Sequence, residues 1–385
     1  MSSPAAAVSA PALRFGDQAS LVLIALIGEY SLLVMPFILG AMMESFGLTE
    51  ARAGQLISLQ LLAMAVASVV VSTRLRAGQS VRGLFVVSVA AISAANAACA
   101  LHVGPIALAA ARALTGLGEG AVMAAAGAVV CGTANPHRMF SMIGTAVAVV
   151  AALALVVTPW LIGYAGPLSI FWVLAVVPLL VLPSLSRVPH LGAGSEVSIG
   201  FIPREIRWPS AALLVSFLLV WCGASGLWVY AERIGAHQGL TPAQIGLWLG
   251  IGQLAGIAGP LAAAAVGPKF SLRRALAAGC IGLAAAAVFF VFGGNAWLYG
   301  LGGCLASFWI MFVVPCFRSR MATIDASGRT VAASAGFYTV GFGVAPLVVA
   351  AITTQGSGYA PVAVFCTLCF LIAAPLASGA KTRTD

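Results

Sequence analysis

The sequence predicts an all-α polytopic membrane protein with twelve transmembrane helices in two pseudo-symmetric six-helix bundles. First, 61% of the 385 residues are hydrophobic and 8% are charged, whereas about a quarter of a soluble domain is charged. Second, the apolar runs are long enough to cross about 30 Å of hydrocarbon as helices and lack the alternation of a β-barrel. Third, a short motif recurs halfway along the chain.

The apolar runs define six candidate spans on each side of the longest internal loop. They cover residues 20–42, 52–73, 83–101, 105–132, 139–163, 167–185, 208–231, 243–266, 274–293, 296–316, 331–353 and 360–378. We therefore expect a disordered cytoplasmic tail (1–19), an N-terminal bundle (20–185), a cytoplasmic linker (186–207), a C-terminal bundle (208–378) and a cytoplasmic tail (379–385).

Lysine and arginine residues are concentrated in the loops on one side of the predicted membrane. The loops of the other side hold only Arg52 and Arg233. Because basic loops stay in the cytoplasm, both termini and the linker are expected there, in a bacterial-type inner (plasma) membrane. The net charge of +9 reflects this asymmetry, and without a soluble basic domain we expect no nucleic-acid partner.

The repeated motif is GLTEARAG at Gly47–Gly54 and GLTPAQIG at Gly239–Gly246. Both copies follow an external loop and precede an even-numbered span, 192 residues apart. Two parallel six-helix repeats are the layout of one large class of secondary transporters. The duplication therefore favours transport over a purely structural role.

Three ionisable residues lie deep in the predicted spans: Glu29, Arg112 and Glu119. Intramembrane charges usually face an interior cavity or pair with one another. Arg112, Thr115 and Glu119 share one helix face, while Glu29 has no partner on its own span. A desolvated carboxyl group can hold and release a proton near neutral pH. The alternatives are a permanently protonated Glu29 and a structural Arg112 that pairs with Glu119 or backbone carbonyls.

The stretch RALTGLGEG, residues 112–120, also contains three closely spaced glycines. Gly116, Gly118 and Gly120 are typical of tight helix packing in membranes. The stretch follows no strand and is not followed by Lys-Ser/Thr, so it does not predict a nucleotide site. The eight cysteines lie in or at the ends of apolar runs without further ligands nearby, so we expect no disulfide, no metal and no other cofactor.

RALTGLGEG resembles the fourth-helix motif of the major facilitator superfamily of secondary transporters, and residues 325–329 (DASGR) resemble a cytoplasmic loop of that family. The span count, the central loop and the two halves extend the resemblance over the whole chain. Two features depart from the family: Leu75 stands where an acid is usual, and span 139–163 lacks the Gly-Pro pattern of exporters. The resemblance implies that spans one, four, seven and ten line a central cavity, where Glu29 and the Arg112 face would meet.

The repeat offset predicts the opposite wall of this cavity. At 192 residues from Glu29 stands Trp221, and no position equivalent to the three charged residues carries a charge. We expect proton coupling by Glu29 and Glu119, with no catalytic residues. We expect substrate binding by Arg112, Thr115, Trp221, Ser225, Trp228, Ser307, Phe308 and Met311.

These features predict a secondary active transporter that exports a small amphipathic organic compound by proton-coupled alternating access. Its expected partners are that substrate, protons and the lipid bilayer, and we expect a monomer. The alternative is a proton-coupled uptake symporter of a small organic, for example aromatic, acid, with Arg112 as a carboxylate clamp. An enzyme or receptor is disfavoured because the sequence shows no soluble domain and no Ser/His/Asp cluster.

Overall fold

The computed structural model describes residues 13–76, 78–191, 208–266, 271–325, 328–353 and 358–379. Within these ranges all regular structure is helical. The outer parts of both predicted tails and residues 192–207 of the predicted linker lie outside the described residues.

The two halves have similar sets of helices. The N-terminal half contains α1 (Phe15–Leu33), α2 (Met35–Phe46), α3 (Glu50–Ser72), α4 (Arg82–Ala100), α5 (Pro105–Cys131), α6 (Pro136–Ala165), α7 (Ser169–Val176) and the 3₁₀ helix η1 (Val177–Arg187). The C-terminal half contains α8 (Trp208–Val229), α9 (Ala231–His237), α10 (Pro242–Gly256), α11 (Ala258–Val266), α12 (Leu272–Phe292), α13 (Ala296–Ile324), α14 (Arg329–Ile352) and α15 (Ala360–Gly379).

Twelve helical segments of the described chain are long and apolar enough to cross a membrane. They follow the predicted spans in order, with two clear differences in their bounds. The first span begins at Phe15, where the carboxylate of Asp17 accepts a hydrogen bond of 3.2 Å from the backbone N–H of Arg14, and an acidic residue in the first turn stabilises a helix. The tenth continues to Ile324, so its last turns carry arginines that were expected in a loop.

Proline residues divide three of the spans. The first span breaks between α1 and α2 at Val34, two residues before Pro36. The eighth breaks between α10 and α11, just before Pro260, and the sixth tightens from α7 into η1, which contains two prolines. Proline has no N–H to donate and its ring clashes with the preceding turn, so it disrupts a continuous helix.

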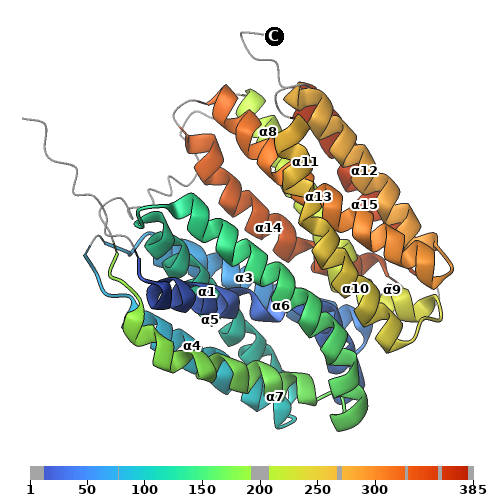
Figure 1. The fold of residues 1–385 in the computed structure, drawn as a ribbon. Coiled ribbons are helices and arrows are strands. Elements are labelled where there is room, and N and C mark those ends of the chain that lie inside the picture. The colour runs from blue at the N-terminus through green and yellow to red at the C-terminus, as the bar shows by residue number, and fades with distance from the viewer. Residues whose placement is uncertain are drawn as a thin grey trace, which may run out of the picture.

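The two halves lie side by side, coloured blue to green and yellow to red in Figure 1. They meet along two helix pairs, α3 with α14 and α6 with α10. We call the end of the bundle where α1 begins the terminal face, and the opposite end the distal face. The repeat makes α3 equivalent to α10 and α6 equivalent to α14. The pseudo-symmetry that relates the two halves therefore exchanges one helix pair with the other.

Helix α5 lies inside the N-terminal half, packed against α3 and α4. A Cβ added at Gly116 or Gly120 would collide with the backbone carbonyls of Gln60 and Met64 on α3. One added at Gly118 would lie 3.0 Å from the carbonyl oxygen of Ser88 on α4. The predicted packing role of these glycines is confirmed.

Candidate functional site

A cavity of about 730 Å³ lies between the two halves. Its wall is formed by residues of α1, α6, α8, α10, α11, α12, α13, α14 and α15, with one from α9. It reaches Phe140 in the first turns of α6 and Pro260 in α11, both near the terminal face. At its other end the wall includes Trp228, close to the distal end of α8.

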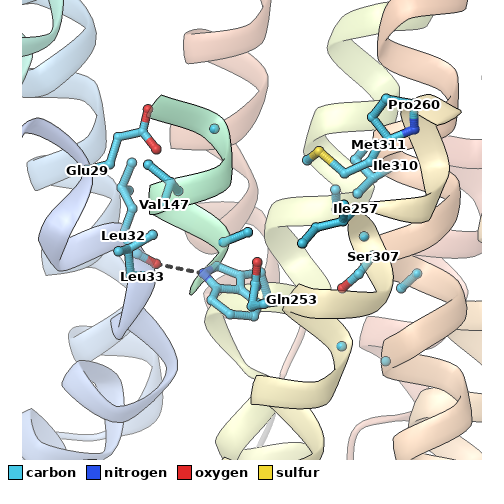
Figure 2. Close-up of a pocket in the computed structure, with 18 of the residues that line it drawn as sticks. Glu29, Leu32, Leu33, Val147, Gln253, Ile257, Pro260, Ser307, Ile310 and Met311 are labelled. Carbon is cyan, nitrogen blue, oxygen red and sulfur yellow. Dashed lines mark hydrogen bonds between the residues drawn. The ribbon is translucent and has the colours of Figure 1, made fainter. Parts of the chain in front are cut away.

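Glu29 provides the charged group on the described wall of this cavity, because every other residue that lines it there is apolar or neutral. The residue is half-buried on α1, about 21 Å from the start of that helix at 1.5 Å per residue. Figure 2 shows Glu29 on one side of the cavity, with Gln253, Ser307 and Met311 on the other. A carboxyl group here faces a mainly apolar space.

Aromatic side chains form one corner of the wall. The ring centroids of Trp221 and Tyr338 lie 4.4 Å apart, with the planes at 70°. Phe342 lies 6.0 Å from Trp221 and 5.9 Å from Tyr338. The indole N–H of Trp221 is buried and has no hydrogen-bond acceptor among the described residues. This corner therefore combines apolar ring surface with an unused donor.

Trp228 connects the two halves at the distal end of the cavity. Its indole N–H donates a hydrogen bond to the backbone carbonyl of Leu32 at 2.9 Å, drawn as the dashed line in Figure 2. Leu32 has no helical partner four residues on, because Pro36 has no N–H. The break in the first span thus supplies the acceptor for this contact.

Five of the ten predicted site residues line the cavity: Glu29, Trp221, Trp228, Ser307 and Met311. Helix rotation places two others elsewhere, since successive residues turn by about 100°. Ser225 points away from the arc of α8 that faces the cavity and donates to the carbonyl of Phe342 at 2.7 Å. Phe308 on α13 does not line the cavity and packs against the ring of Trp309.

The other three, Arg112, Thr115 and Glu119, are fully buried on α5 and do not line the cavity. The resemblance implies that the fourth span, α5, lines the cavity beside α1. In the structure, α6 lines it there instead. The reason is the packing of α5 on α3 and α4 through its glycines, which encloses its polar face. The Thr115 hydroxyl donates to the carbonyl of Ala111.

Arg112 and Glu119 belong to a buried polar network inside the N-terminal half. The guanidinium donates to Asn96 Oδ1 at 2.6 Å and to Gln60 Oε1 at 3.3 Å. Gln60 Nε2 donates in turn to Glu119 Oε2 at 3.0 Å and to the Ser31 hydroxyl at 2.7 Å. The Gln60 amide thus joins the two charged groups.

Sequence reasoning missed Gln60 and Asn96 as partners of Arg112, and it missed Phe342 on the cavity wall. Gln60 lies on the span opposite Arg112, and a buried amide in an apolar run is a signal for an interhelical hydrogen bond. The ring of Phe342 looks like any other apolar residue of a span. Only its rotation and its contact with Trp221 separate it from the lipid-facing phenylalanines.

A second charged cluster closes the distal face. Arg233 of α9 forms ion pairs of 3.0 Å with Glu232 beside it and with Glu44 of α2, in the other half. Burial raises the pKa of Glu232 above its usual value, and Arg233 opposes this effect. The Glu44 pair holds α2 and α9 together across the two halves.

The sequence matches the family model of the Major Facilitator Superfamily over residues 19–324. A comparison with curated proteins gives no match. Among solved structures, a D-xylose-proton symporter superposes with a TM-score of 0.74 at 13% identity, over 96% of this chain and 99% of that one.

Two further solved structures have the same fold. The inward open xylose transporter of E. coli has a TM-score of 0.74 at 13% identity, over 94% of each chain. A bacterial homologue of the human lysosomal transporter Spinster, in an inward-facing and occupied conformation, has a TM-score of 0.72 at 13% identity, also over 94% of each. With a family match over most of its length and this twelve-helix fold, the chain belongs to the major facilitator superfamily, a family of membrane transporters.

Proposed function

We propose that this chain is a secondary active transporter that exports a small amphipathic organic compound in exchange for protons, by alternating access. The cavity between the two halves carries this proposal. Its volume of about 730 Å³ is in the range that holds a drug-sized molecule. Its wall is apolar and aromatic around the single carboxyl group of Glu29, which suits a substrate with an apolar body and a polar end.

The orientation follows from the basic loops. The terminal face lies in the cytoplasm of a bacterial-type cell under the positive-inside rule. The cavity then extends toward the cytoplasm, and the ion pair of Arg233 with Glu44 connects the two halves on the outer side. Two similar structures are described as inward-facing or inward open, which supports the same assignment here.

Glu29 is the proton carrier in this proposal. An ionised carboxyl group in an apolar cavity is costly unless a proton or a counter-ion neutralises it. Substrate and proton therefore compete for the same group, and each releases the other on opposite sides of the membrane. Arg112 and Glu119 lie behind the wall, where their hydrogen-bond network joins α3, α4 and α5 beside α1. If Glu119 carries a second transported proton, its protonation must change this network.

The proposed direction is outward because of the chemistry of the substrate. An amphipathic compound crosses a bilayer without a carrier, so energised transport is needed chiefly to move it out of the cell. Uptake of an organic acid would instead need a cation on the cavity wall. In the alternative function of acid uptake, Arg112 would bind the carboxylate. In the structure it donates hydrogen bonds to Asn96 and Gln60, away from that wall.

The test measures accumulation of ethidium and of neutral N-phenyl-1-naphthylamine in energised cells that lack their main exporters. We expect the protein to lower accumulation of at least one probe, and both an uncoupler and Glu29→Gln to abolish the effect. Glu29→Asp is the matched control and keeps a measurable part of it, because the carboxyl group remains.

The contrary result is unchanged accumulation of both probes together with energised uptake of labelled benzoate that depends on Arg112. That result would replace the export proposal with acid uptake.

A further inference from the structure

We infer that the cavity selects organic monocations, which Glu29 and the aromatic corner of Trp221, Tyr338 and Phe342 recognise together. This inference rests on the proposed function and names the charge class of its substrate.

The first step is the sign and number of charges at the cavity. Glu29 supplies the one carboxyl group of the described wall, which has no cationic side chain of its own, and Arg318 of α13 lies outside the wall but close enough to Tyr338 to act on it electrostatically. Arg112 and Glu119 lie behind the wall, joined through Gln60, and neither contributes a side chain to it. In an apolar space a fixed charge is weakly screened. The wall therefore attracts a monocation, repels an anion, and lacks a second carboxylate for a dication.

The second step is the aromatic corner. Trp221 meets Tyr338 at 70° and Phe342 at 65°, so the three rings enclose a corner and do not form a stack. Aromatic ring faces attract cations, most strongly the indole of tryptophan, and they bind quaternary ammonium groups that cannot form hydrogen bonds. Rings of this kind also give an apolar body a close fit.

Neither indole N–H of the wall is available to a ligand. The indole N–H of Trp221 is buried without an acceptor in the described chain, whereas the N–H of Trp228 is bound to the Leu32 carbonyl. Protein atoms cover the Trp221 nitrogen, so this corner presents ring surface to a ligand and not a hydrogen-bond donor. The site thus fits a cation with an apolar, ring-containing body.

The same wall disfavours other classes of ligand. Sugars, nucleosides and peptides need many hydrogen-bonding groups. Apart from Glu29, the polar side chains of the described wall are those of Ser141, Thr145, Gln253, Ser307 and Tyr338 and the two indoles. The hydroxyls of Ser141 and Thr145 and the indole of Trp228 already donate to backbone carbonyls. Calcium and magnesium ions need about six or more oxygen ligands, and the described residues contain no group of three or more His, Cys, Asp or Glu that could hold a metal ion.

The experiment uses three probes of similar shape and different charge: tetraphenylphosphonium, triphenylphosphine oxide and tetraphenylborate. Binding to the full-length protein in nanodiscs is measured by titration calorimetry, with empty nanodiscs subtracted. We expect the cation to bind at least about tenfold more tightly than the anion, since one charge interaction of about 1.4 kcal/mol gives that ratio. The neutral probe should fall between them.

Variants assign the selectivity to residues. Glu29→Gln should remove the preference for the cation, while the neutral probe binds as before. Tyr338→Leu should weaken cation binding by about tenfold and Tyr338→Phe much less, because the ring face is what a cation contacts. Trp160→Leu is the matched control: Trp160 is exposed on the outside of α6, and its replacement should change nothing. Thermal unfolding of each variant checks that it is folded.

Equal binding of the phosphonium and borate probes, or a preference that survives Glu29→Gln, overturns the inference. Uncoupler-sensitive export of the neutral naphthylamine probe in cells would then leave the proposed function standing without its charge class. Selective binding of the cation without any energised export gives the reverse: the cation site stands and the proposed function fails.

Discussion

At the scale of single residues, the buried network of the N-terminal half explains how Arg112 and Glu119 can lie inside an apolar bundle. Arg112 is fully buried, yet the described residues place no carboxylate within ion-pair distance of it. The Gln60 amide lies between, accepting from Arg112 and donating to Glu119. The ring of Phe171 lies 5.2 Å from the guanidinium and adds a cation–π contact. Both ionisable groups are thus hydrogen-bonded to one neutral amide and are not directly paired.

This arrangement predicts a strong energetic coupling between the two ends of the network. Arg112→Met leaves the Glu119 carboxylate buried without a cation, so we expect a loss of about 3–5 kcal/mol in the free energy of unfolding. Adding Glu119→Gln should recover part of that loss, with a coupling energy of about 1–3 kcal/mol. Chemical denaturation in detergent measures both.

Probe binding separates this structural role from the substrate contact that the sequence predicts for Arg112. Tetraphenylphosphonium should bind the folded double variant as it binds the unaltered protein, since neither residue lines the cavity. If binding is lost while the fold is kept, Arg112 contacts the substrate in another state of the cycle.

At the scale of elements, the break between α1 and α2 provides a contact between the halves. Pro36 deprives the Leu32 carbonyl of its helical donor, and the indole of Trp228 takes that place. A hydrogen bond of this kind is worth about 1 kcal/mol, which is about a fivefold shift between two states of similar stability. The kink therefore favours the distally closed state.

We predict that Pro36→Ala and Trp228→Phe loosen the distal face in the same way. Alanine restores an N–H that competes for the Leu32 carbonyl, and phenylalanine removes the donor. Hydrogen exchange in peptides covering 34–47 and 228–241 should rise in each variant, and the double variant should add little, because both remove one bond. Trp160→Phe is the control. Additive effects would mean that the two residues act independently.

The sequence predicted the elements well and their rotations poorly. Spans follow from run length, and the repeat predicts equivalent halves, because both signals are one-dimensional. The orientation of α5 about its own axis is not encoded in this way. In a membrane the lipid-facing side of a helix is as apolar as the packed side. The sequence therefore predicts that Arg112 lies on a helix, but it does not predict toward which neighbouring helices the side chain points. Its direction depends on contacts such as Gly116 against Gln60, which only the fold supplies.

At the scale of the whole molecule, the duplicated motif marks the points where the halves cross. Gly54 on α3 faces α14, where an added Cβ would overlap the hydroxyl of Tyr230, which donates to the Pro346 carbonyl, and would lie 3.2 Å from that carbonyl oxygen. Its repeat partner Gly246 on α10 approaches Leu155 and Pro159 on α6. All these contacts lie near the distal face. Two equivalent glycines thus let the halves close there, and alternating access requires these crossings to separate.

Larger side chains at these two positions should bias the protein against its distally closed state. Gly246→Leu places atoms where the Leu155 carbonyl lies, so the distal ends of α6 and α10 must move apart, and Gly54→Leu should do the same for α3 and α14. Gly163→Leu on α6 is the matched control, because a Cβ there has no neighbour within 4 Å. Hydrogen exchange should rise at the distal ends and fall at the terminal ends of all four helices if the halves rock as rigid bodies. A rise at both ends, with a lower unfolding temperature, would instead show that these glycines only pack the bundle and that the crossings do not govern access.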